Sequence, residues 1–388
     1  MALFSCLKFE MGSSRRRSKR VDPSPLKVAD DHDPLNKKPP TNCNNSVDAH
    51  MIKRYSWPEI HRIIAGNSSR VIGEGGFSTV YLAHLNLTSI DPQHHRTTTT
   101  TPAALKIHTN TSTSERLSRL FKQELHIMLQ IRHPNIVKLL GYCDEQEESA
   151  LVLEYIPNGS LHDKLHDDID DENNSSSSSS SSRGGILPWK KRMRIAFQLA
   201  QAIDYLHSSC HLQIVHGDIK SSNVLLDDQL NCRLCDLGSA KMGFSSSINN
   251  RSRSRSILLA GSPGYIDPHY LRTGIASKKN DVYSYGVILL ELITGMEAFS
   301  SHNHKLLTSI LDPILKNVDD HIMTMMTMGQ QLAQITDPRL ATAAGGFPPH
   351  QELVLMTSLA ARCIRHQPSL RPSMVDILGT MSQNIDHH

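Results

Sequence analysis

The chain has 388 residues, of which 38% are hydrophobic and 20% are charged, and its formal net charge is +3. These values are typical of a globular protein with a buried core, and the small net charge gives no reason to expect a nucleic-acid partner. The best apolar run, residues 286–293, is far shorter than the roughly 20 residues that a spanning helix needs, so a transmembrane protein is excluded.

Several short features bear on where the protein acts. The N-terminus lacks the apolar region of a signal peptide, and seven cysteines without an export signal favour reduced thiols. Ala2 stands where N-myristoylation needs glycine, whereas palmitoylation of Cys6 stays open. The basic run 15–20 fits a nuclear signal, a membrane-binding patch or a merely solvated surface. We expect a cytoplasmic protein, with peripheral contact at the plasma membrane and entry into the nucleus left open.

The first half of the chain predicts a small β-rich lobe behind a disordered tail. Residues 1–50 are polar and have no apolar period, so we expect them to be disordered. Strand patterns follow at 71–85 and 103–109, with residues 91–102 as polar filler in the hairpin between them. An amphipathic helix is predicted at 114–131, and two more strands at 136–143 and 150–156.

The second half predicts a larger, mostly helical lobe. An acidic and then serine-only tract at 167–185 cannot pack and is expected to be a disordered insertion. Long apolar-periodic segments at 189–210, 278–295 and 351–365 predict helices, and a polar, Met-rich extension lies between 299 and 335. The fold class is therefore α+β, with one lobe at about 51–153, a second at about 154–384, and a short tail at 385–388.

Five features in a fixed order carry the chemistry. A Gly-rich turn, GEGGFSTV at 73–80, lies between two strands and lets the backbone approach a triphosphate, although alone it fits a plain hairpin equally well. Lys106 lies on the next strand and Glu124 on the following helix, and the segments HGDIKSSN and CDLG come later. On this ordered set, the chain resembles the protein kinase family from about residue 69 to residue 382.

The resemblance implies a role for each matching residue. Asp218 accepts the proton of the substrate hydroxyl, and Lys220, typical of Ser/Thr-directed kinases, offsets charge on the transferred phosphoryl group. Lys106, paired with Glu124, holds phosphates of ATP. Asn223 and Asp236 hold Mg²⁺, or Mn²⁺ in its place. The expected nucleotide site is made up, besides Lys106, of Ile72, Gly73, Glu74, Gly75, Gly76, Phe77, Ser78, Val80, Ala104, Glu154, Ile156 and Leu225.

Motifs such as HPNIVKLLGYC and GDIKSSNVLLD resemble those of plant receptor-like kinases, and in particular their receptor-like cytoplasmic branch. The resemblance implies the two-lobed kinase fold and an ATP-dependent Ser/Thr kinase with protein substrates. It also implies a membrane receptor kinase as a partner. The alternative is a catalytically weak pseudokinase that acts as a scaffold in a receptor complex.

Four residues depart from the usual family pattern. Ser78 replaces the third glycine of the turn, and Leu237 replaces the usual Phe, which would pack against the side chain of Met128. His269 replaces a Glu that would pair with Arg371, so we expect that buried ion pair to be missing or replaced by a weaker contact. Gly217 replaces an arginine that binds a phosphate on the activation loop, which removes a switch and no catalytic group.

Three further expectations concern single side chains. Ser262 matches a hydroxyl residue that hydrogen-bonds towards Asp218 and Lys220, and Asp281 matches a buried aspartate that braces the catalytic-loop backbone. Cys232 and Cys235 form a C-x-x-C pair without a second pair, so a structural role is favoured over a zinc site.

Overall fold

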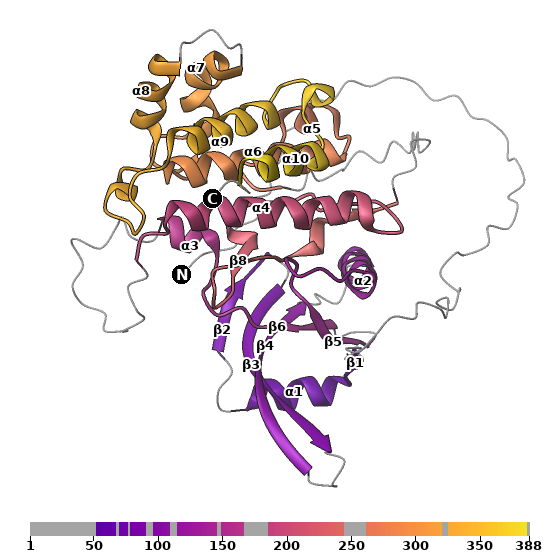
Figure 1. Ribbon diagram of the computed structural model, residues 1–388. Helices are drawn as coiled ribbons and strands as arrows, with labels where there is room; N and C mark the ends of the chain where they lie inside the picture. Colours follow the sequence, from indigo (N-terminus) through magenta and orange to yellow (C-terminus); the bar gives the residue numbers. More distant parts are fainter. Residues whose placement is uncertain are drawn as a thin grey trace, which may run out of the picture. The chain divides into compact units, whose positions relative to one another are not determined.

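The computed structural model describes residues 52–66, 70–76, 78–90, 96–108, 115–145, 149–166, 185–243, 261–319 and 325–385. The predicted tail 1–50 and all but the last residue of the predicted insertion 167–185 lie outside these ranges. The long strands gather at one end of the described domain, together with helices α1 and α2, and the other helices lie at the opposite end (Figure 1). Its helices include none that is long and apolar enough to cross a membrane.

A six-stranded sheet forms the N-terminal lobe, in the order β1-β5-β6-β4-β3-β2. Its strands are β1 Lys53–Arg54, β2 Arg70–Glu74, β3 Ser78–Ile90, β4 Arg96–His108, β5 Leu139–Asp144 and β6 Ser149–Glu154. Neighbouring strands are antiparallel except for β1, which runs parallel to β5. The predicted antiparallel sheet is therefore confirmed, with one short parallel strand added.

The prediction of polar filler at 91–102 is wrong for residues 96–102. These residues belong to β4 and pair with β3 in continuous register, from Arg96 opposite Ile90 to Pro102 opposite His84. The reason is that threonine, although polar, is β-branched and suits an extended backbone. A long hairpin extends from the sheet as a result (Figure 1).

Helix α1, Trp57–Ala65, precedes the Gly-rich turn and was not predicted. A capping box joins Ser56 and Glu59 at its start, and Ile60 is buried in a core cluster with Ala83 and Leu105 of the sheet. The signal was present in the sequence, since Ser three residues before Glu is a helix-start pattern. The predicted helix at 114–131 is confirmed as α2, Glu115–Gln130.

The C-terminal lobe is built around helix α6, Lys278–Thr294, in which every residue from Asp281 to Thr294 is buried. The other helices are α3 Leu161–His166, α4 Trp189–Asp204, α5 Pro268–Thr273, α7 Leu307–Asp319, α8 Met325–Ile335, α9 His350–Cys363 and α10 Met374–Ile385. Helices α4 and α9 pack on α6, and α10 packs on α4 (Figure 1). The extension predicted at 299–335 contains the helices α7 and α8.

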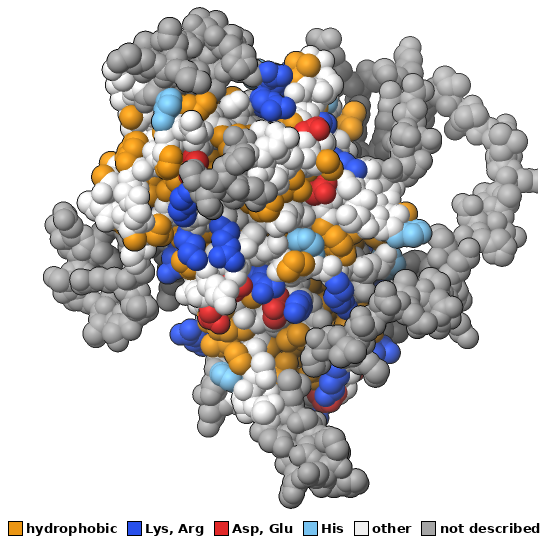
Figure 2. Space-filling model, viewed as in Figure 1, with side chains coloured by type: hydrophobic (Ala, Val, Ile, Leu, Met, Phe, Trp, Pro, Cys, Tyr) orange, Lys and Arg blue, Asp and Glu red, His pale blue; other side chains and the backbone are white. Residues whose placement is uncertain are grey.

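Three short strand pairs lie in the described part of the C-terminal lobe. They are β7 Ile214–Val215 with β10 Lys241–Met242, β8 Val224–Leu226 with β9 Cys232–Leu234, and β11 Phe299–Ser300 with β12 Lys305–Leu306. The segments between β7 and β10 hold the HGD and DLG motifs. On the face shown in Figure 2, hydrophobic side chains of the described residues are scattered, and charges of both signs lie side by side where the lobes meet.

Candidate active site

A lysine held between two carboxylates forms the centre of the site. Lys106 Nζ lies 2.8 Å from Glu124 Oε1 on α2 and 2.8 Å from Asp236 Oδ1. The predicted pair of Lys106 and Glu124 is thus confirmed, and it is buried, with Glu124 only 2% exposed. Burial alone lowers the pKa of Lys106, but the charges of Asp236 and Glu124 outweigh this effect and raise it above its ordinary value. Lys106 therefore stays charged.

Asp236 occupies an unusual backbone conformation. Its φ of 62° lies in the left-handed region, which is uncommon for residues other than glycine and is often found at functional sites. The Lys106 charge holds the pKa of the Asp236 carboxyl well below its usual range. The next residue, Leu237, is 2% exposed and belongs to the same extensive hydrophobic core as Met128, so it is buried, and its direct contact with Met128 stays a prediction. The buried leucine anchors the turn while the carboxylate stays partly open.

Asp281 stabilises the backbone of the catalytic loop, the HGDIKSSN segment, as predicted. Its carboxylate accepts hydrogen bonds from the backbone N–H groups of His216 and Gly217, each at 2.9 Å, and lies 2.8 Å from His207 Nε2. Gly217 has a φ of 79°, and a Cβ atom there would lie 3.0 Å from the Ser239 carbonyl oxygen. Glycine therefore fits both the backbone conformation and the close approach at this position.

Asp218, Lys220 and Ser262 form a closed hydrogen-bonded triangle. Ser262 Oγ donates to Asp218 Oδ1 at 2.9 Å, Lys220 Nζ donates to Ser262 Oγ at 2.9 Å, and Lys220 Nζ lies 3.0 Å from Asp218 Oδ2. The contacts predicted for Ser262 are confirmed. Ser262 lies outside the catalytic loop, in the segment that leads into α5. Its hydrogen bonds therefore fix this segment against the catalytic loop and orient the Asp218 carboxylate.

Asn223 has one oxygen with no hydrogen-bond partner. Its Nδ2 donates to the Asp218 carbonyl oxygen at 2.8 Å, while its Oδ1 is buried and unpartnered among the described residues. A buried acceptor left unpaired costs free energy, and an amide oxygen near a carboxylate suits a hard divalent cation. Asn223 and Asp236 therefore fit the group predicted for them, Mg²⁺ or Mn²⁺.

The predicted nucleotide residues lie on β2, β3, β4, β6 and β8, apart from Gly75 and Gly76 in the turn after β2 and Ile156 just after β6. Val80 is opposite Lys106 and Leu82 is opposite Ala104 in the antiparallel register, so Val80, Ala104 and Lys106 share one face of the sheet. Gly75 N–H donates to the Ser78 carbonyl at 2.7 Å and closes the Gly-rich turn. The remaining members described are Ile72, Gly73, Glu74, Gly76, Glu154, Ile156 and Leu225, whereas Phe77 lies outside the described residues.

Arg371 has a buried carboxylate partner, which overturns the expectation drawn from His269. Its Nη1 and Nη2 donate to Asp267 Oδ2 and Oδ1 at 2.6 and 2.8 Å. Asp267 also caps α5 by accepting from the His269 backbone N–H at 2.8 Å. The ion pair is therefore intact, because the carboxylate lies two residues earlier in the chain. The prediction considered only position 269, and it did not identify Asp267 as the partner of Arg371.

Three features together define a phosphoryl-transfer site. They are a lysine between two carboxylates, an aspartate bridged to a lysine by a serine, and two oxygen ligands for a metal. This arrangement, set between a β-rich and an α-rich lobe, is that of a protein kinase. A family model for the protein kinase domain matches residues 67–381.

Relatives agree with this class of protein. Salt tolerance receptor-like cytoplasmic kinase 1 of Oryza sativa subsp. japonica is 41% identical over 384 residues, which cover 98% of this chain and 93% of the relative. A probable receptor-like protein kinase of Arabidopsis thaliana is 44% identical over 334 residues, which cover 85% of this chain and 87% of that protein. A probable LRR receptor-like serine/threonine-protein kinase of the same plant is 31% identical over 332 residues, 85% of this chain and 32% of that protein. The chain belongs to the protein kinase family and, within it, to the plant receptor-like cytoplasmic kinases. It is a protein serine/threonine kinase.

Cys235, immediately before Asp236, offers a test of the geometry of the site. Burial, with the Asp236 charge, raises the pKa of its thiol to about 12, so almost no thiolate exists at neutral pH. We expect alkylation to be slow at pH 7, to speed up about tenfold per pH unit up to pH 9, and to be slowed by Mg-ATP. Mass spectrometry of labelled peptides, with Cys235→Ser as the control, measures this. Labelling that is equally fast with and without saturating Mg-ATP would contradict a thiol beside the nucleotide.

Proposed function

We propose that this kinase is catalytically competent and that the residues described above perform the transfer of the γ-phosphoryl group of ATP to Ser or Thr hydroxyls of proteins. The observation that carries the proposal is the double contact of Lys106 with Glu124 and Asp236 at 2.8 Å. This contact needs the helix, the sheet and the DLG segment to be in place at once, and kinases require such an arrangement for transfer.

Each residue has a distinct task. Asp218 accepts the proton of the attacking hydroxyl, and Ser262 and Lys220 hold its carboxylate in one orientation. Lys220 also lies where it offsets charge on the phosphoryl group in flight, and Lys106 orients the phosphates that stay behind. When bound, Mg²⁺ neutralises phosphate charge, and Asn223 Oδ1 with the Asp236 carboxylate would hold it.

The pseudokinase alternative is less well supported. A chain released from catalysis would more readily have lost Lys106, Glu124, Asp218, Asn223 or Asp236, and all five are present. Asn223 Oδ1, which has no hydrogen-bond partner among the described residues, also favours a metal site. A buried unpaired acceptor costs free energy of folding, and a scaffold has no function for it that would offset this cost.

The test is an assay of phosphoryl transfer from radiolabelled ATP, run with Mg²⁺ and with Mn²⁺, on the wild type and on Asp236→Asn. We expect the variant to lose at least about a hundredfold in rate because its metal ligand is neutral. The exposed Asp228→Asn variant, with the same change of charge, is the control and should keep its rate. Transfer at background level by both the wild type and Asp236→Asn would support the pseudokinase.

The partner is a membrane receptor kinase, and the substrates are proteins. The relatives that support this part of the proposal are receptor-like kinases, one of them named for the cytoplasmic branch. The chain acts in the cytoplasm at the inner side of the plasma membrane through peripheral contact.

Regulation follows from Gly217 and Ser262. Kinases place the activation loop between positions that correspond to Asp236 and Pro268. Without an arginine at position 217, phosphates on serines of this segment lack a partner in the catalytic loop. The serines concerned, which lie outside the described residues, are Ser245, Ser246, Ser247, Ser252, Ser254 and Ser256. We expect their joint replacement by Ala to change the rate by less than about tenfold, or 1.4 kcal/mol of barrier. Ser262→Ala should cost more, since it opens the triangle with Asp218 and Lys220. An inactive six-site variant beside a fully active Ser262→Ala variant would contradict this model of regulation.

A further inference from the structure

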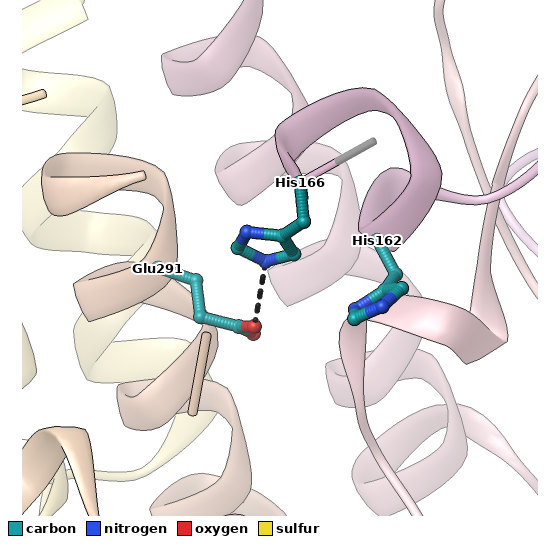
Figure 3. A group of neighbouring side chains, drawn as sticks. All are labelled: His162, His166 and Glu291. Carbon is teal, nitrogen blue, oxygen red and sulfur yellow. Dashed lines mark hydrogen bonds and ion pairs between the residues drawn. The ribbon is translucent and has the colours of Figure 1, made fainter. Parts of the chain in front are cut away.

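A second cluster of metal-ligating side chains lies on the helical lobe, apart from Asn223 and Asp236. His162 and His166 are four residues apart on α3, so both project from one side of that helix. Glu291 comes from α6 and points at them (Figure 3). One ligand atom from each of the three side chains lies within 4.8 Å of the others. The two imidazoles and the carboxylate therefore surround one small volume.

The distances already approach those of a coordinated ion. His166 Nε2 lies 3.3 Å from Glu291 Oε1, which is long for a charged hydrogen bond. Two ligand atoms at about 2.0 Å from a tetrahedral zinc ion are separated by about 3.3 Å. The two imidazole rings have centroids 4.8 Å apart, and His162 is half-buried, so a small rotation of His162 completes the set.

The charge of Glu291 is poorly compensated. Its side chain is fully buried, and no Lys or Arg of the described residues forms an ion pair with it. Its donors are the Tyr265 hydroxyl, 2.8 Å from each carboxylate oxygen, and Ser221 Oγ at 3.2 Å. Neutral donors offset a buried carboxylate only in part, so a cation beside it is strongly favoured.

A second observation supports a ligand here. His166 Nδ1 is buried and has no hydrogen-bond partner among the described residues. Among the described residues, hydrogen bonding therefore holds the ring only through Nε2, the nitrogen that faces Glu291 and can bind an ion. Imidazole nitrogens do not suit Mg²⁺ or Ca²⁺, whereas two His and one Glu form a well-known zinc ligand set that leaves one position for water.

We propose that His162, His166 and Glu291 bind a divalent transition-metal ion, with Zn²⁺ the best match. The ion reaches the site past the half-buried His162 and takes a water as fourth ligand. Because Glu291 also holds Tyr265 and Ser221, the ion ties α3 to two segments that adjoin the catalytic residues. Ser221 follows Lys220 directly, and Tyr265 lies three residues after Ser262.

The experiment uses the full chain, freed of metal by a chelator and titrated with Zn²⁺ alone in competition with a chromophoric zinc indicator. Because other histidines occur in the chain, the readout is the difference between wild type and variants. We expect His162→Ala and His166→Ala each to lose one equivalent, with affinity at least about a hundredfold weaker. The exposed His350→Ala variant is the matched control and should bind like the wild type.

Two further measurements make the result decisive. Zn²⁺ at a hundredfold excess over its Kd should raise the melting temperature of the wild type by about 5 °C and leave that of His162→Ala unchanged. Co²⁺ in place of Zn²⁺ should give the strong visible bands of four-coordinate cobalt in the wild type and in His350→Ala, but not in His162→Ala. Equal zinc stoichiometry and affinity for wild type and His162→Ala would overturn the proposal, whether or not His166→Ala folds. These readouts involve no phosphoryl transfer, so failure of the proposed function leaves them intact.

Discussion

Replacing Lys106 with methionine is expected to lower the rate of phosphoryl transfer by about 10²–10³ while the domain stays folded. The lysine is the cation between Glu124 and Asp236, at 2.8 Å from each, and without it the phosphates of ATP lose their contact on the sheet. The remaining Glu124 would be a buried carboxylate with only the His108 imidazole beside it, whose Nε2 lies 3.6 Å from Glu124 Oε2. Burial already raises the pKa of Glu124, so this side chain can take up a proton, which limits the loss of stability.

The measurement is single-turnover transfer from radiolabelled ATP, with circular dichroism as the test of folding. Lys138→Met is a suitable control, because Lys138 is an exposed lysine just before β5 and away from the carboxylates. We expect the control to keep its rate. Undiminished autophosphorylation by Lys106→Met would show that Lys106 does not hold the phosphates.

Replacing Asp267 with asparagine is expected to destabilise the fold by about 3–5 kcal/mol. Arg371 is only 2% exposed, and its guanidinium donates two hydrogen bonds to Asp267, the only carboxylate among the described residues with which it forms an ion pair. Asparagine keeps the size of the side chain but removes its charge, so the guanidinium would be left buried with only carbonyl partners at Arg365 and Lys279. The cost is that of an uncompensated buried charge.

Urea unfolding at equilibrium measures this change. Asp312→Asn is the matched control, since its ion pair with Lys316 is equally short at 2.6 Å but exposed, and it should cost less than about 1 kcal/mol. His269→Glu should also have a small effect in the wild-type background, because Asp267 already satisfies Arg371. A loss below about 1 kcal/mol in Asp267→Asn would mean that this pair does not hold the lobe together.

The local chemistry of the site could be predicted from the sequence. Lys106, Glu124, Asp218, Asn223 and Asp236 were found because the chain carries the motifs of the protein kinase family in their usual order, and α2 because its apolar period is strong. The left-handed conformation of Asp236 and the 3.3 Å approach of His166 to Glu291 could not be predicted, since each depends on packing around the residue.

The sequence by itself determined the α+β class, the order of the elements except α1 and the first part of β4, and the candidate site residues, since these depend on local periodicity and on recognisable motifs. The tertiary structure alone decided which carboxylate meets Arg371 and which helix brings Glu291 to His162 and His166. Asp267 and Arg371 are separated by 104 positions, and His166 and Glu291 by 125. Such pairs form because folding closes long loops around a common core, and no local pattern encodes which partners then come into contact.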